Sequence, residues 1–247
     1  MKAMVLAAGL GTRLRPLTDN RPKALVEVAG YTMLEITLRR LASFGIREVI
    51  VNVHHFADMV VDYLKRNDNF GMRIVISRED VLLDTGGGLK KAASFFLDGG
   101  AEEPFILHNV DVISSIDLLQ MIKVHQESKA LATLAVQARE TSRYLMFNSE
   151  NELCGRQAGR DGPVEMVRSA AKTQSLAFCG IHVISPRLLS MMSEDGIFSI
   201  ITTYLRFAGY GERISAFRAD DYYWRDLGKP ENITQAAQDI EHGLVRV

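Results

Sequence analysis

The 247-residue sequence has only two cysteines, no long apolar run and almost no net charge. Cys154 and Cys179 lack the close Cys or His spacing of a zinc site, and they do not suggest a disulfide framework. The chain contains no apolar stretch of the ~18 to 20 residues that a membrane span needs. Its beginning lacks the charged, apolar and small-residue order of a signal peptide. We therefore expect a cytoplasmic protein that has no membrane partner.

The near-neutral charge limits the choice of ligands. Lysine and arginine total 29 and aspartate and glutamate total 30, so the formal net charge is −1. Such a protein has no long-range field to attract nucleic acid, which we exclude as a partner. An anion must instead be held by local cations and backbone N–H groups. The 47% hydrophobic fraction is ordinary for a globular protein and suffices for one sizeable core, so we expect a single domain over residues 1–247.

Short apolar runs alternate with helical patterns through the first half of the chain. We expect strands at residues 2–8, 48–53, 73–77, 104–108 and 131–137, with helices at 34–44, 57–65, 89–97 and 116–128. This alternation predicts right-handed βαβ crossovers and an α/β fold, with a Rossmann-like, mainly parallel sheet flanked by helices. Irregular hairpins at 143–155 and 157–168 indicate a smaller inserted, lid-like β region. Later strands are expected at 176–184, 214–218 and 222–226, and later helices at 188–192, 199–208 and 229–242.

The loop after the first strand is the first candidate site, because ligands of open α/β sheets bind beyond the carboxyl ends of the strands. Gly9 and Gly11 let the backbone approach a bulky anion, and Arg13 adds positive charge. The loop is not a dinucleotide fingerprint, because Leu14 stands at the third glycine position and Pro16 opposes an immediate helix. It also lacks the Gly-Lys-Ser/Thr of a P-loop. The structural alternative is a tight turn between a strand and a helix.

A second cation follows a short distance downstream, at Pro22-Lys23. Together, the Gly-x-Gly-Thr-Arg loop and this Pro-Lys pair resemble the signature of the sugar nucleotidyltransferase family. The resemblance is closest to the N-acetylmuramate-1-phosphate uridylyltransferase group, followed by the mannose-1-phosphate guanylyltransferases. It implies transfer of a nucleoside monophosphate from an NTP to a sugar 1-phosphate, with release of pyrophosphate. It also implies a nucleotide-binding half over residues 1–110 and a sugar-binding half over residues 111–247.

The family's motif positions imply a role for each matching residue. Arg13 would hold the leaving phosphates and Lys23 would neutralise the transition state, so both are candidate catalytic residues. For an isolated arginine or lysine, a solvated surface charge is the alternative. The candidate nucleotide-binding residues are Ala8, Gly9, Gly11, Thr12, Arg13, Lys23, Asp84, Gly86 and Gly87.

Two distant aspartates are candidate Mg²⁺ ligands. Displacement at the α-phosphorus brings two anions together, and a metal held on carboxylate oxygens can cancel their repulsion. Asp111 follows an expected strand, and Asp226 lies in a Trp-x-Asp-x-Gly segment that the family shares. Taken singly, each could be a turn or cap residue. Val110 stands where the family usually has glycine. If the backbone at this position needs a positive φ, valine would be strained there. If the glycine only allows substrate to approach closely, a small shift of the backbone could make room for the valine methyl groups.

Base and sugar contacts are implied by weaker motifs. Asp84 begins Asp-Thr-Gly-Gly-Gly, whose glycines can lie against a base and offer N–H donors. This segment is similar to the Glu-Thr-Gly-Gly-Gly of the uridylyltransferase group and favours UTP. Candidate sugar-binding residues are Asn109, Gly180 and Arg143. Gly180 could equally be a strand bulge, and Arg143 a surface arginine.

The resemblance therefore implies in-line attack of a sugar phosphate on an NTP, with UDP-N-acetylmuramate for cell-wall recycling as the corresponding product. We expect a monomer or a small homo-oligomer. A guanylyltransferase of the GDP-mannose type is one alternative. A regulatory subunit that binds nucleotide sugars without turnover is another; Val110 favours it, whereas Lys23, Asp111 and Asp226 argue against it.

Overall fold

Parallel strands form the first half of the central sheet. The computed structural model describes residues 1–98 and 102–246. Strand β1 (Lys2–Leu6) lies between β6 (Phe105–Asn109) and β4 (Glu48–Val53), and β4 pairs with β5 (Arg73–Arg78). All three pairs are parallel. These expected strands are confirmed, with ends that differ by no more than two residues. The prediction succeeds because strands of a parallel sheet are buried on both faces and therefore show as short apolar runs.

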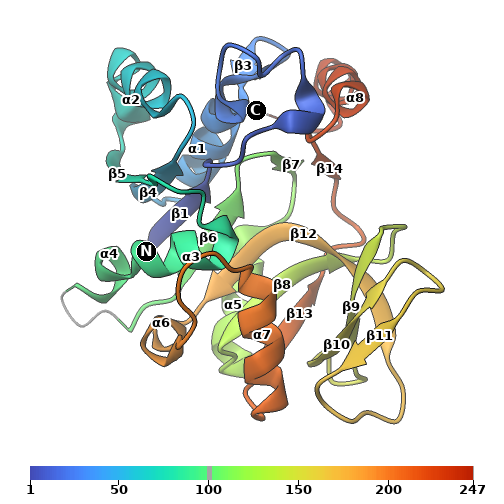
Figure 1. Ribbon diagram of the computed structural model, residues 1–247. Helices are drawn as coiled ribbons and strands as arrows, with labels where there is room; N and C mark the ends of the chain where they lie inside the picture. Colours follow the sequence, from blue (N-terminus) through green and yellow to red (C-terminus); the bar gives the residue numbers. More distant parts are fainter. Residues whose placement is uncertain (99–101, 247) are drawn as a thin grey trace.

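Antiparallel strands complete the sheet. Strand β12 (Gln174–Ile184) runs antiparallel to β6, to β8 (Ala132–Gln137) and to β9 (Arg143–Phe147), while β13 (Ile214–Arg218) runs parallel to β8. The expected hairpins are β9, β10 (Leu153–Ala158) and β11 (Val164–Met166). They extend the sheet in the order β12-β9-β10-β11 and are not a detached lid (Figure 1). The Rossmann-like fold class with its smaller β region is confirmed.

Helices cover both faces of the sheet. Their bounds are α1 (Met33–Ser43), α2 (Ala57–Arg66), α3 (Asp84–Lys91), α4 (Ala93–Leu97), α5 (Leu118–Ser128), α6 (Arg187–Met191), α7 (Ile200–Gly209) and α8 (Pro230–Glu241). One buried apolar cluster contains residues of α1, α2, α5 and α8, and the other contains residues of α3, α4, α6 and α7. Along β1, Ala3 and Val5 join the first cluster and Met4 the second, so the sheet has a core on each face. Within the described ranges, none of these helices has the length and hydropathy of a membrane span.

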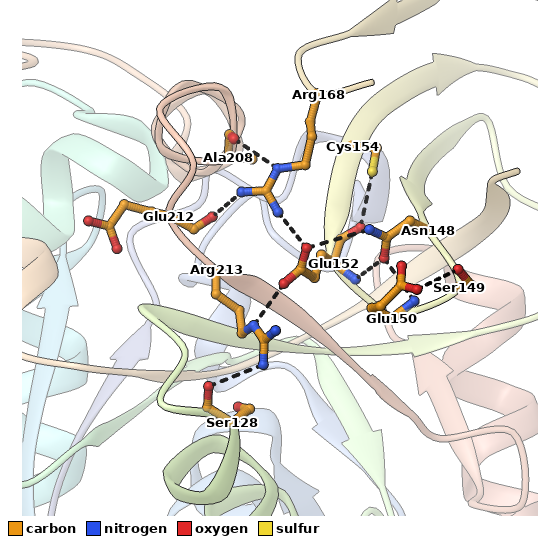
Figure 2. Close-up of polar contacts among 10 residues, drawn as sticks. All are labelled: Ser128, Asn148, Ser149, Glu150, Glu152, Cys154, Arg168, Ala208, Glu212 and Arg213. Carbon is orange, nitrogen blue, oxygen red and sulfur yellow. Dashed lines mark hydrogen bonds and ion pairs between the residues drawn. The ribbon is translucent and has the colours of Figure 1, made fainter. Parts of the chain in front are cut away.

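An ionic network attaches the β9–β10 hairpin to the rest of the second half of the chain (Figure 2). The Glu152 carboxylate accepts hydrogen bonds from Arg168 at 2.7 Å and from Arg213 at 2.8 Å. Arg168 also donates to the carbonyl oxygens of Ala208, in the last turn of α7, and of Glu212. One guanidinium therefore satisfies a carbonyl at a helix C-terminus and a carboxylate beside the hairpin, which fixes the two elements relative to each other.

Of the shortest elements, the sequence pattern predicts only β14 (Trp224–Asp226), which lies within the strand expected at 222–226. Strand β7 (Val112–Ser114) pairs antiparallel with β14, and β2 (Glu27–Val28) pairs with β3 (Tyr31–Thr32). Single 3₁₀ turns are η1 (Thr12–Leu14), η2 (Lys23–Leu25) and η3 (Asp68–Gly71). Elements of two to four residues are too short to show a period. The β7–β14 pair matters for function because it joins two segments that lie far apart in the sequence.

Candidate active site

A cavity of about 370 Å³ opens where β1 and β6 end. This is the edge of the sheet at which an open α/β fold binds ligands, and the volume is that of a small-molecule pocket. Six of the predicted site residues line this cavity: Ala8, Gly9, Lys23, Asp84, Asn109 and the predicted metal ligand Asp111.

The two glycines of the first loop do different things. Gly9 lines the cavity, and an added Cβ there would meet no heavy atom of the described residues within 4 Å, so a side chain would take up ligand space. Gly11 has a φ of +64°, and an added Cβ would lie 2.9 Å from Thr18 Cγ2 and 3.0 Å from Lys23 Cβ. Gly11 therefore lets the loop turn closely against Lys23.

Lys23 meets the Asp111 carboxylate. The lysine opens the η2 turn directly after Pro22, whose backbone is extended with a φ of −70°. Its ammonium group donates to Asp111 Oδ2 in an ion pair whose side chains are 12% and 16% exposed. Salt screens such a largely buried pair less than a surface pair. A predicted catalytic cation and a predicted metal ligand thus lie in direct contact.

The β7–β14 pair brings Asp226 to the same corner. Asp226 is the register partner of Val112, which directly follows Asp111. The N–H of Leu227 donates to the Asp111 carbonyl oxygen at 2.8 Å. The two aspartates therefore lie on neighbouring stretches of backbone, although the sequence separates them by half of the chain.

Arg13 lies at the edge of the site, outside the cavity lining. It is exposed in η1, as is Thr12. An added Cβ at Gly228 would lie 2.8 Å from Arg13 Nη2 and 2.7 Å from Asp226 Oδ1, so the guanidinium and this carboxylate flank the same glycine. A ligand that extends from the cavity toward Asp226 would reach Arg13. The roles of Thr12 and Arg13 in phosphate binding stay predictions.

Val110 fits its position without backbone strain. It is buried, lines the cavity and is not among the non-glycine residues of positive φ. Its N–H donates to the Leu6 carbonyl oxygen at 3.2 Å, which continues the β1–β6 pairing. Of the two interpretations that the sequence allows, a need for positive φ is therefore ruled out.

The glycines after Asp84 are placed differently from our expectation. They lie inside α3, which begins at Asp84 and not at residue 89. The N–H groups of Gly86 and Gly87 donate to the Phe198 carbonyl oxygen at 2.9 and 3.3 Å, so neither is free for a base. An added Cβ at Gly86 would collide with the Phe198 ring. These glycines allow close packing of α3 against the segment before α7, while Asp84 and Thr85 face the cavity.

The candidate sugar-binding residues lie in two separate places. Gly180 has a φ of +74° and lies at a register shift in the β12–β8 pairing, as a bulge would. An added Cβ there would lie 2.8 Å from Asn109 Nδ2 and 3.0 Å from Val112 Cγ2, so Gly180 makes room for the Asn109 side chain. Arg143 is exposed at the start of β9 and does not line the cavity.

Several residues that line the cavity are not among the predicted site residues. These are Leu6, Asn52, Leu82, Thr85 and Ile197. Asn52 does carry a signal, because it is a polar residue within the apolar run of strand β4 and is buried. Ile197 shows none, since an exposed isoleucine in a loop is indistinguishable from ordinary surface.

Arg139 is a further cation on the Asp226 side. Its guanidinium lies over the Trp224 ring, 3.7 Å from the ring centroid, and donates to the Phe178 carbonyl oxygen at 2.7 Å. Burial lowers the pKa of Arg139, and the nearby Asp226 carboxylate acts in the opposite direction. The guanidinium stays charged and contributes positive potential beside the predicted metal ligand.

Two neutral histidines lie buried behind the site. Burial lowers the pKa of His108, the neighbour of Asn109 on β6, to about 4. Burial likewise lowers the pKa of His182 on β12 to about 3, and its Nδ1 lies 2.8 Å from the Tyr204 hydroxyl oxygen. Both imidazoles are therefore uncharged near neutral pH, and neither adds charge to the cavity.

The carboxylates fit a magnesium ion shared with substrate. Within residues 1–98 and 102–246 no cluster of three or more His, Cys, Asp or Glu side chains could hold a metal alone. Mg²⁺ characteristically takes one or two carboxylates and fills its other positions with water and phosphate oxygens. Asp111 and Asp226, on adjacent backbone segments, match that donor set.

Comparison with known proteins places this site in a family. The Nucleotidyl transferase family matches residues 2–153. N-acetylmuramate alpha-1-phosphate uridylyltransferase of Caulobacter vibrioides is 34% identical, over 93% of this chain and 92% of its own length. Mannose-1-phosphate guanyltransferase of Yarrowia lipolytica is 28% identical over 94% of this chain, which spans 62% of that protein. The structure of a UDP-glucose pyrophosphorylase from Acinetobacter baumanii superposes with a TM-score of 0.78 at 18% identity, over 98% of this chain and 94% of that one.

The fold is therefore that of the sugar-nucleotide pyrophosphorylases, with the cavity at the expected edge of the sheet. The chain belongs to the Nucleotidyl transferase family, and the resemblance inferred from its motifs is confirmed. Its enzyme class is sugar-1-phosphate nucleotidyltransferase.

Proposed function

We propose that this enzyme transfers a uridylyl group from UTP to N-acetylmuramate 1-phosphate and releases pyrophosphate. The support is the similarity to the Caulobacter vibrioides uridylyltransferase, which extends over almost the full length of both chains. Among the described residues, the observation that carries the proposal is the contact of Lys23 with Asp111 in the lining of a cavity that Gly9 also lines, with Asp226 on the strand that pairs beside Asp111.

The protein side chains position and neutralise anions in this mechanism. A sugar phosphate oxygen attacks the α-phosphorus in line, and pyrophosphate leaves on the opposite side. The attacking oxygen is already an anion, so no side chain has to remove a proton. Lys23, at the cavity wall, stabilises charge on the transferring phosphoryl group, and Arg13, at the edge, holds the leaving phosphates.

Asp111 and Asp226 are the residues that would hold Mg²⁺, which supplies charge neutralisation between the two anionic substrates. Asn109, beside Gly180, contacts the sugar in this proposal. Asp84 and Thr85, which also line the cavity, contact the nucleoside in this proposal.

A pyrophosphate-release screen tests the proposal. Each of the four NTPs is combined with N-acetylmuramate, N-acetylglucosamine, glucose and mannose 1-phosphates in the presence of Mg²⁺. We expect the highest kcat/KM with UTP and N-acetylmuramate 1-phosphate. A preference for GTP and mannose 1-phosphate would replace the proposal with the reaction named for the Yarrowia lipolytica relative. Nucleotide binding without turnover of any pair would indicate a regulatory subunit.

A further inference from the structure

Two buried polar side chains connect two loops that line the cavity. The Ala7 N–H, after β1, donates to Asn52 Oδ1 at 2.7 Å. Asn52 Nδ2 donates to Glu79 Oε1 at 2.7 Å, and the Leu83 N–H donates to Glu79 Oε2 at 2.9 Å. Asn52 is 2% exposed and Glu79 is 4% exposed. These three hydrogen bonds form a continuous bridge from the loop after β1 to the loop before α3.

Each end of the bridge adjoins residues that line the cavity. Ala7 precedes Ala8 and Gly9, and Leu83 precedes Asp84 and Thr85. Asn52, in the middle of the bridge, lines the cavity itself. The length of the bridge therefore sets the separation between the wall that carries the glycine loop and the wall that carries Asp84.

The pattern of donors and acceptors in this bridge constrains its two side chains. The backbone N–H groups at its two ends can only donate, so the side-chain atoms that face them must accept. Of the two inner side-chain atoms, one must donate and the other accept, and here Asn52 supplies the donor and the Glu79 carboxylate the acceptor. With Glu79→Gln alone, two donors would face each other at one point of the bridge. An unmatched buried donor is costly, so the pair must combine one amide with one carboxylate.

Gly88 allows close packing against the bridge. An added Cβ at this position in α3 would lie 2.7 Å from Glu79 Oε1 and 2.9 Å from Asn52 Nδ2. Helix α3 thus packs its backbone directly against the Asn52–Glu79 hydrogen bond. A change in that bond would shift the start of α3, where Asp84 and Thr85 lie.

We propose that Asn52 and Glu79 are positioning residues that set the width of the nucleotide end of the cavity. The inference rests on the proposed binding of an NTP there. Because the bridge joins the glycine loop to the Asp84 loop, its disruption weakens NTP binding more than sugar phosphate binding.

A polarity swap tests this role. Glu79→Gln leaves a donor facing a donor, and Asn52→Asp places two carboxylates against each other. The double variant Asn52→Asp/Glu79→Gln restores the bridge with reversed polarity: the aspartate accepts from the Ala7 N–H and from the glutamine amide, and the glutamine oxygen accepts from the Leu83 N–H. KM for each substrate and the Kd of the NTP with Mg²⁺, measured by titration calorimetry, are compared for all four proteins.

We expect each single change to raise KM and Kd for the NTP about tenfold or more, with KM for the sugar phosphate within about twofold. The double variant should return to within about threefold of the unaltered protein. Thr133→Val is the matched control, because it removes a buried hydrogen bond to His125 in the other half and should leave both KM values unchanged. If Asn52→Asp does not fold, Glu79→Gln and the double variant carry the comparison.

Two results would overturn the proposal: single variants whose NTP affinity is unchanged, or a double variant no better than Glu79→Gln. Neither result would contradict the proposed nucleotidyltransferase reaction, because the unaltered protein would still bind and use NTP. An unaltered protein that binds no NTP would instead contradict the proposed function.

Discussion

Acid should destabilise this protein through three histidines that are buried without charge. Burial lowers the pKa of His108 and His125 to about 4 and that of His182 to about 3, against an ordinary value of 6.5. Below 6.5 the unfolded chain binds protons at these positions while the folded chain does not. Folding stability is therefore complete above this pH and falls as the pH drops toward the folded-state values.

The size of the effect follows from the same values. At pH 5, about 1.5 units below the unfolded-state pKa, each histidine favours unfolding by about 2 kcal/mol, since one unit corresponds to about 1.36 kcal/mol. The three together give about 6 kcal/mol. A free energy of unfolding is typically about 5 to 15 kcal/mol, so this loss is decisive.

Urea unfolding at pH 8, 6 and 5, followed by the fluorescence of the single tryptophan, measures the loss directly. Few unfolded-state carboxylates bind protons in this range, so the histidines dominate. His125→Gln should reduce the difference between pH 8 and pH 5 by about 2 kcal/mol, because it removes one of the three groups. A free energy of unfolding at pH 5 within about 2 kcal/mol of the pH 8 value, or NMR spectra showing these imidazoles protonated in the folded protein at pH 5, would refute the reasoning.

Four further substitutions test the site. Gly11→Ala should lower the free energy of unfolding by about 1 to 3 kcal/mol, because alanine is strained at positive φ, whereas Gly9→Ala should leave stability unchanged and weaken NTP binding. Equal losses of stability in urea unfolding would contradict this division. Lys23→Met should reduce kcat about 100-fold or more, and a normal kcat would remove Lys23 from the mechanism. Asp226→Asn should raise the Mg²⁺ concentration for half-maximal rate about tenfold or more, and an unaltered Mg²⁺ dependence would exclude it as a ligand.

The long elements and the first loop could be predicted because their signals are local. The strand at 48–53 and the helix over 34–44 follow from apolar periodicity within a single window of sequence. The turn at Gly11 follows from the conformational freedom of glycine. The start of α3 was mispredicted because glycine disfavours helices, and the close approach of Phe198, which only glycine permits, overrides that preference.

The class of fold, the family and the candidate groups for chemistry could be predicted from the sequence, because periodicity and motif spacing are properties of neighbouring residues. Which of those groups contact one another depends on the tertiary structure. The contact of Lys23 with Asp111, the approach of Asp226 through β14 and the bridge from Asn52 to Glu79 all join distant segments. Such pairings depend on how strands and loops pack in space, and no local pattern in the chain encodes them.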